Sequence, residues 1–177
     1  MRTIVLLAVF FSTMLQSQVM NDAQVLRPKK AGAHVSAVQS NGVISPVAGF
    51  GIGIFRGADI EVAGKKSPGL LYISINTEII LRYQPCISLS LGGHYETIAS
   101  GADMTVNVSF PINRFSTLYT GVDADANYVN GNIKTPFWYF AGINTFFSRG
   151  FEGFLEIDPA IFSPTSIVLI GGVRYYF

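Results

Sequence analysis

Few side chains in this sequence have the types and spacing that catalysis requires. Ser90, His94 and Glu96 lie at even spacing, so a strand would present all three on one face. A hydrolase or acyltransferase needs its serine within hydrogen-bond reach of the histidine. Ser90 and His94 would lie about 13 Å apart at about 3.3 Å per residue along a strand. We therefore expect no catalysis, although a serine from a neighbouring strand would leave a lipid-modifying enzyme as an alternative.

Two acidic groupings have a spacing compatible with a metal site. Asp123 and Asp125 share one face of a strand, as do Glu152, Glu156 and Asp158. Carboxylates on one face can bind a cation at a rim, and they can equally pair with basic side chains inside a fold. We expect pairing, and hence no metal and no cofactor.

The composition indicates a membrane-compatible chain without membrane helices. Hydrophobic residues make up 49% of the 177 residues, charged residues make up only 13%, and mean hydropathy is +0.39. Soluble domains carry roughly 25% charged residues. Beyond the N-terminus no apolar run approaches the ~18 residues of a membrane helix, so the apolar residues are dispersed, as in strands. A net charge of +1 predicts no nucleic-acid partner, and the single cysteine, Cys86, excludes an internal disulfide.

The N-terminus has the pattern of a secretory signal. Arg2 precedes an apolar stretch, Thr3–Leu15, and a cut near Ser17 follows it. We expect residues 1–17 to be a signal peptide and residues 18–46 to be a periplasmic segment. Ser40-Asn41-Gly42 is a passable hairpin turn within that segment, which could extend the first strand, form a short extra hairpin or stay disordered.

From Val47 onward the sequence alternates between apolar and polar residues with a period of two. This pattern is typical of strands in a sheet with two unlike faces. We predict eight strands in a barrel domain spanning 47–177: Val47–Arg56, Gly69–Tyr83, Ile87–Ile98, Met104–Ile112, Thr117–Tyr128, Phe137–Ser148, Phe151–Ile157 and Ser166–Phe177.

Short and long connections alternate between these strands. Tight turns are predicted at 84–86, 113–116 and 149–150, and longer loops at 57–68, 99–103, 129–136 and 158–165. Such alternation is typical of an up-and-down antiparallel meander with one short-turn end and one long-loop end. We expect the last strand to close the barrel against the first, near Val47–Phe55.

The distribution of charge indicates which face points outward. No lysine falls within a predicted strand, whereas solvated strand faces and edges normally use lysine. The polar face is therefore assigned to a confined lumen, in which Arg82 and Arg174 pair with acids. The predicted lumen charges are Glu78, Arg82, His94, Glu96, Asp123, Asp125, Glu152, Glu156 and Arg174. A soluble secreted barrel with an apolar interior that binds an apolar ligand is the alternative.

Aromatic residues gather near both ends of the predicted apolar faces. Rings at these positions are expected to form two girdles at the level of the lipid headgroups. The short-turn girdle comprises Tyr83, Phe110, Phe147, Phe151, Tyr175 and Phe177, and the long-loop girdle comprises Tyr95, Tyr128, Phe137 and Tyr139.

With its signal peptide, its alternating hairpins and its terminal Val173-x-Tyr175-x-Phe177, the chain resembles the small eight-stranded outer-membrane β-barrel proteins of Gram-negative bacteria, the OmpA/OmpX-like group. The resemblance implies an all-β, eight-stranded antiparallel transmembrane barrel in the cell outer membrane. It also implies that the assembly machinery of that membrane reads the C-terminal strand. We expect a monomer surrounded by outer-membrane lipid, porin-like in shape, with a packed polar lumen. Its expected role is structural or in surface interaction through four loops.

Overall fold

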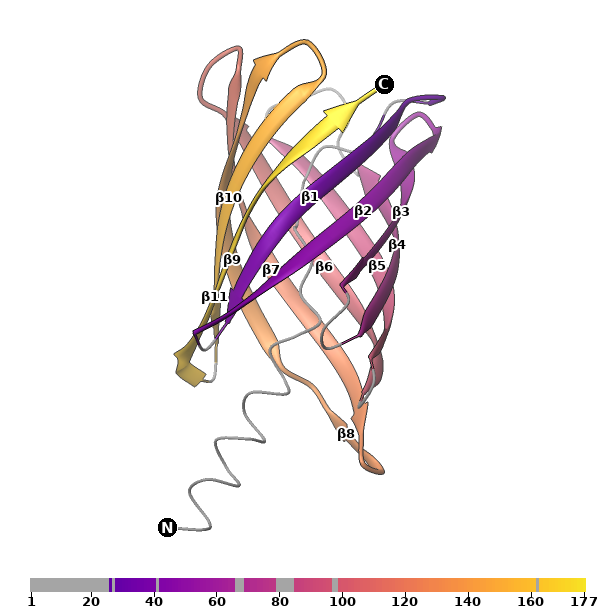
Figure 1. Ribbon diagram of the computed structural model, residues 1–177, viewed down its shortest axis with the longest axis vertical. Coiled ribbons are helices and arrows are strands. Elements are labelled where there is room, and N and C mark those ends of the chain that lie inside the picture. The colour runs from indigo at the N-terminus through magenta and orange to yellow at the C-terminus, as the bar shows by residue number, and fades with distance from the viewer. Residues whose placement is uncertain are drawn as a thin grey trace.

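The chain forms one antiparallel sheet that closes on itself (Figure 1). The computed structural model describes residue 26 and residues 28–40, 42–65, 69–78, 85–96, 99–161 and 163–177. The strands are β1 (Ala31–Ser40), β2 (Val43–Phe55), β3 (Ala58–Lys65), β4 (Leu70–Glu78), β5 (Cys86–Glu96), β6 (Ser100–Pro111), β7 (Ser116–Val129), β8 (Asn132–Lys134), β9 (Phe137–Ser148), β10 (Phe151–Ala160) and β11 (Ser163–Tyr176). The predicted signal peptide, 1–17, lies outside the described residues.

The barrel has ten strands, so the prediction of eight is wrong. Each strand of the ring pairs with the strands before and after it in the chain, and these pairings include β6 with β7. The short β8 is not part of the ring, because it pairs with β7 alone. The first and last strands also pair, with Gly32 opposite Tyr176 and Ser40 opposite Val168. The closing partner of the C-terminal strand is therefore β1 rather than the predicted 47–55, which lies in β2.

One of the two missed strands is β1, in the segment expected to lie in the periplasm. The barrel begins at Ala31 and not at Val47. β1 and β2 form a hairpin around Gly42, which is one of the alternatives stated above for residues 18–46. Gly42 has a φ of 77°, which favours glycine in a tight turn. The strand is rich in alanine, glycine and serine, so it lacks the strong apolar alternation that marks the other strands.

The other missed strand is β3, in the predicted loop 57–68. A two-residue turn at Arg56-Gly57, with Gly57 at a φ of 84°, returns the chain from β2 into β3. Charged residues occupy one face of β3, so the segment has the local polarity of a loop. The expectation of lysine-free strands is therefore also corrected, because Lys65 belongs to β3 and is buried.

The two ends of the barrel differ less in loop length than the sequence suggested. The upper rim in Figure 1 holds the C-terminus and the connections after β2, β4, β6 and β9, and the lower rim holds the other six connections. The β7–β8 hairpin projects from the lower rim, and its turn residues Asn130 and Gly131 have φ values of 50° and 84°. The predicted continuation of the second strand through 79–83 lies outside the described residues.

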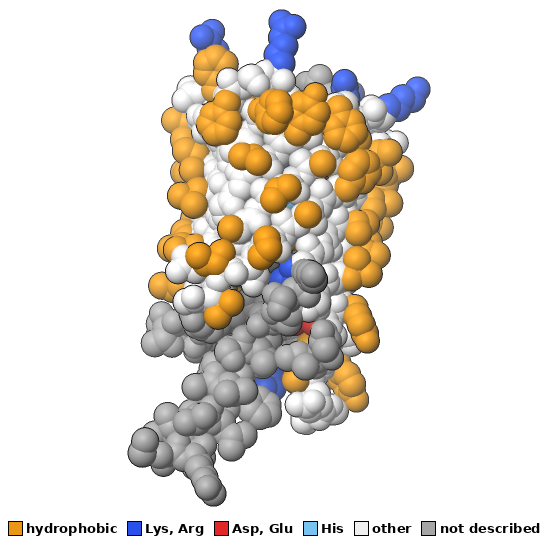
Figure 2. Space-filling view, in the orientation of Figure 1, with side chains coloured by type: hydrophobic (Ala, Val, Ile, Leu, Met, Phe, Trp, Pro, Cys, Tyr) orange, Lys and Arg blue, Asp and Glu red, His pale blue; other side chains and the backbone are white. Residues whose placement is uncertain are grey.

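The outer wall of the barrel is apolar. Side chains that point outward from the described strands carry no formal charge, and many large ones are exposed, including Leu91 at 54%, Val122 at 47% and Leu155 at 60%. Figure 2 shows hydrophobic side chains over the visible face of the wall, with lysine and arginine side chains projecting from the upper rim. No helix in the described part of the chain is long and apolar enough to span a bilayer.

The interior combines polar side chains with an apolar cluster that the sequence analysis did not foresee. Its members are the buried residues Val38, Val47, Ala63, Leu70, Tyr72, Trp138, Phe154, Val168 and Ile170. These side chains come from strands on opposite walls of the barrel, so they fill its cross-section. Inward glycines leave space for the larger side chains beside them. A Cβ on Gly142, for example, would lie only 2.3 Å from the ring of Tyr119, so a larger residue there would clash with this ring.

Candidate functional site in the lumen

The predicted lumen charges that fall within the described residues all point into the barrel. Their exposed fractions are small: His94 6%, Glu96 4%, Asp123 5%, Asp125 4%, Glu152 1%, Glu156 1% and Arg174 7%. The side chain of Glu78 and the whole of Arg82 lie outside the described residues. Period-two alternation therefore assigned the inward face of each of these strands correctly.

Sequence reasoning missed several other inward groups. Those assigned to loops or to solvent, but buried or nearly buried here, are His34, Asp59, Glu61, Lys65 and Asp103. The alternating pattern of a strand was present in β3, because Asp59, Glu61 and Lys65 alternate with the apolar residues Ile60 and Val62. The signal for Asp103 was weaker, since Ser100-Gly101-Ala102 looks like a turn.

One charged network surrounds Arg174. Its guanidinium lies 3.8 Å from Glu61 Oε2 and donates a hydrogen bond to Tyr176 Oη at 3.3 Å. The Tyr176 hydroxyl in turn donates to Glu152. His34 Nδ1 lies 3.6 Å from Glu61 Oε1. Arg174 thus pairs with a lumen acid, as its inward position required, but the acid belongs to the strand that was predicted as a loop.

A second network of neutral donors links β3, β4 and β5. Ser90 Oγ donates to Asn76 Oδ1 at 2.6 Å, and Asn76 Nδ2 donates to Asp59 Oδ1 at 2.7 Å. The backbone N–H of Leu26 donates to the other oxygen of Asp59 at 2.7 Å, so the chain before β1 reaches into the upper part of the lumen. The hydroxyl hydrogen of Ser90 is thus directed at Asn76.

A third group lies on β5, β6 and β7, where His94, Asp103 and Asp125 bring one ligand atom each within 4.8 Å of one another. Tyr72 Oη donates to Asp103 Oδ2 at 2.9 Å, and Trp138 Nε1 donates to Asp125 Oδ2 at 3.1 Å. Both carboxylates are thereby oriented by aromatic donors on other strands. The next acid along β7, Asp123, accepts a hydrogen bond from Thr105 at 2.7 Å and stands outside this group.

Charge inside the described barrel is strongly unbalanced. Eight buried carboxylates and the nearly buried Glu61 face two basic side chains, Lys65 and Arg174. Buried charges need partners, because their hydration is lost. Among the described residues, carboxylates outnumber the lysine and arginine side chains of the lumen.

One small cavity lies between these side chains. It has a volume of about 30 Å³ and lies in the upper half of the lumen, lined among others by His34, Glu61, Asn76 and Arg174. This volume suits a small number of water molecules and no larger solute.

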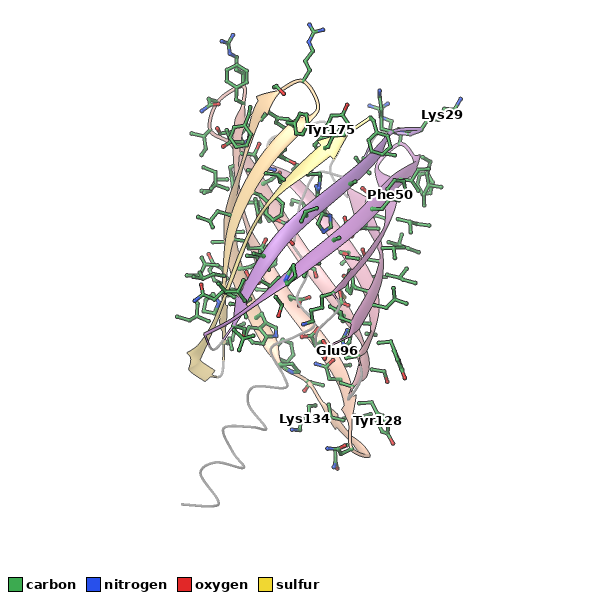
Figure 3. All side chains as sticks on the ribbon, in the orientation of Figure 1. Lys29, Phe50, Glu96, Tyr128, Lys134 and Tyr175 are labelled. Atoms are coloured by element: carbon green, nitrogen blue, oxygen red, sulfur yellow. The ribbon has the colours of Figure 1, made fainter. Side chains whose placement is uncertain are left out.

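The predicted girdle aromatics point away from the lumen. Exposed fractions range from 41% for Phe137 to 70% for Phe147. Phe110, Phe147, Phe151, Tyr175 and Phe177 belong to strand ends at the upper rim, and Tyr95, Tyr128, Phe137 and Tyr139 to the lower half. Figure 3 shows Tyr175 and Phe50 at the upper end and Tyr128 at the lower end, with Glu96 inside. Tyr83 lies outside the described residues.

The geometry defines a closed, up-and-down antiparallel barrel with a polar lumen and an apolar wall. Comparisons with known protein families and with curated protein sequences found no match. Among solved structures, the chain is similar to an outer membrane channel from Pseudomonas putida F1, with a TM-score of 0.55, 8% identity, and coverage of 91% of this chain and 100% of that one. It is also similar to the NanC porin (TM-score 0.53, 10% identity, coverage 81% and 98%) and the KdgM porin (0.52, 7%, 82% and 99%). At such identities the likeness establishes the fold alone.

Proposed function

We propose that this chain is an outer-membrane β-barrel protein with a structural or surface-interaction role and no catalytic activity. The observation that carries this proposal is the reversal of polarity across the wall. Charged side chains of the described strands turn inward, and the outward faces are apolar and uncharged. An antiparallel sheet in water has the opposite arrangement, with its polar face exposed.

The extent of the apolar wall supports lipid as its surroundings. Each of the ten barrel strands carries at least one outward leucine, isoleucine, valine or phenylalanine that is exposed at about 40–70%. Monomeric soluble proteins rarely expose contiguous apolar patches larger than about 300–600 Å². A bilayer removes this cost, and a closed ring of strands leaves no unpaired backbone edge in the hydrocarbon.

We also propose how the barrel is oriented in the membrane. Aromatic pairs stand at the upper rim, where the rings of Phe151 and Tyr175 lie 4.6 Å apart and those of Tyr175 and Phe177 lie 5.7 Å apart. We place this rim at the periplasmic side, so that the C-terminal strand faces the assembly machinery. The lower rim, with its β7–β8 hairpin, then faces outward and offers the surface for interaction.

The small lumen cavity argues for a closed barrel within this proposal. The apolar cluster around Phe154 and Ile170 and the network around Arg174 fill the cross-section. The interior also leaves no room for the apolar ligand of a soluble calyx in the cavity beside Arg174. We therefore expect a monomer that does not conduct ions through a steady open pore.

Three measurements test this proposal. The folded protein in detergent should migrate differently on a gel before and after boiling, and cell membranes should retain it during extraction at high pH. In planar bilayers it should give no sustained conductance steps. Release into the aqueous phase at high pH without detergent would exclude the membrane barrel, and steady conductance steps would exclude the closed lumen.

A further inference from the structure

The group formed by His94, Asp103 and Asp125 carries an inference beyond a passive lumen. We propose that the barrel binds a divalent transition-metal ion, Zn²⁺ by the chemistry of its ligands, through one imidazole and two carboxylates from β5, β6 and β7. Their ligand atoms lie within 4.8 Å of one another, and all three residues are buried. This proposal replaces the expectation of a lumen without a metal.

Unpartnered atoms point to a ligand at this place. His94 is 6% exposed and Asp103 is 8% exposed, yet His94 Nδ1 and Asp103 Oδ1 have no hydrogen-bond partner among the described residues. The two atoms face each other at 4.0 Å, which is too long for a hydrogen bond. Buried polar atoms are normally paired, and an ion between these two would satisfy both.

The surroundings have the features of a supporting shell. Carboxylates that bind metals are usually held by further hydrogen bonds, which fix their orientation. Tyr72 holds one oxygen of Asp103 and Trp138 holds one oxygen of Asp125, so each carboxylate keeps its other oxygen for an ion.

Two inward glycines make the space for this group. A Cβ on Gly92 would lie 2.6 Å from Asp103 Oδ1, and a Cβ on Gly101 would lie 2.8 Å from His94 Cε1. Any other residue at either position would therefore press on a proposed ligand. The glycines are needed for the arrangement of these ligands, whereas neither has a positive φ that would require glycine for the backbone.

The ligand chemistry selects the ion. An imidazole nitrogen favours a transition metal over Mg²⁺ or Ca²⁺, which prefer oxygen ligands alone. Three protein ligands with a water or a nearby oxygen in the fourth position form a usual zinc site. Zn²⁺ bonds of about 2.0–2.2 Å place tetrahedral donor atoms roughly 3.3–3.6 Å apart, so binding draws these side chains together by about 1 Å.

The test uses the protein purified from membranes in detergent and stripped with a chelator. Titration with Zn²⁺ in a calorimeter should give one ion per chain, with no saturable binding of Mg²⁺. H94Q and D103N should weaken the affinity by more than about 100-fold, and Y72F, which removes only a supporting hydrogen bond, by about 10–100-fold. H34Q and D123N are matched controls, because they change a buried histidine and a buried aspartate outside the group, and both should bind as the unmodified protein does.

A second measurement needs no ligand variant, in case H94Q or D103N does not fold. The chain has two histidines, His34 and His94. With ¹⁵N-labelled histidine, Zn²⁺ should shift the imidazole nitrogen resonances of His94 and leave those of His34 in place, and the H34Q protein assigns the two sets. Absence of saturable Zn²⁺ binding, undiminished binding by folded H94Q and D103N, or an unshifted His94 resonance would each overturn the proposal.

Discussion

Replacing Leu91 with arginine tests whether the outer wall contacts lipid. Leu91 lies at the middle of β5, points outward and is 54% exposed. Its partners across the ladder are Ile75 on β4 and Met104 on β6, which are 50% and 48% exposed. Arginine at this position would therefore stand in an apolar band on both sides, far from either rim.

The expected cost follows from this position. Arginine on the lipid face at the bilayer midplane costs about 2–4 kcal/mol. A loss of about 3 kcal/mol lowers the folding equilibrium constant roughly 150-fold, since about 1.4 kcal/mol corresponds to a factor of ten. With a urea dependence of about 2 kcal/mol per molar, the unfolding midpoint should fall by about 1.5 M.

Urea unfolding in lipid vesicles, followed by tryptophan fluorescence and by the heat-dependent gel shift, measures this change. Ile133→Arg is the matched control: Ile133 is 74% exposed on β8, in the hairpin beyond the barrel, and should change stability by less than about 0.5 kcal/mol. Equal stabilities for L91R and the parent protein would refute the inference that this wall meets hydrocarbon, because a surface leucine in water tolerates arginine.

Two further predictions concern the interior. Arg174→Met should destabilise the barrel by about 3–5 kcal/mol in the same urea assay, because it removes the guanidinium beside the nearly buried Glu61. A double variant that also carries Glu61→Gln should recover part of this loss. If the single variant is as stable as the parent protein, this ion pair does not stabilise the barrel. Gly172→Ala should cost about 1–3 kcal/mol, since its Cβ would come within 2.4 Å of a backbone oxygen on β1. The neighbouring Gly171→Ala, whose Cβ meets nothing nearer than 3.5 Å, should be close to neutral, and equal effects of the two would argue against the close approach of β11 to β1.

Sequence reasoning recovered the direction of side chains better than the number of strands. In β11, for example, Tyr175 and Val173 point outward and Arg174 points inward, as period two requires. The same reasoning passed over β3, because Asp59, Glu61 and Lys65 gave that segment the composition of a loop. A charged residue that lies inside a lumen looks, in a single sequence, like one in solvent.

The grouping of lumen residues could not be read from the sequence, because it depends on how the strands align. His94, Asp103 and Asp125 come together because Asp103 lies opposite both Gly92 on β5 and Asp125 on β7. A shift of one residue would turn Asp103 outward. The apolar cluster around Trp138 and Ile170 likewise depends on strands that meet only across the barrel.

The pairing of β1 with β11 has a consequence for the timing of folding. The backbone bonds that hold Gly32 beside Tyr176 join the first strand of the barrel to the last, so they cannot form until β11 has been synthesised. Contacts between such distant parts of a sequence are slow to form because loop closure must precede them. During that interval both strands expose unpaired edges, which are prone to aggregation. The pairing of β1 with β11 is therefore among the last contacts of the barrel that can form, and β1 lacks a strand partner on that side until it does.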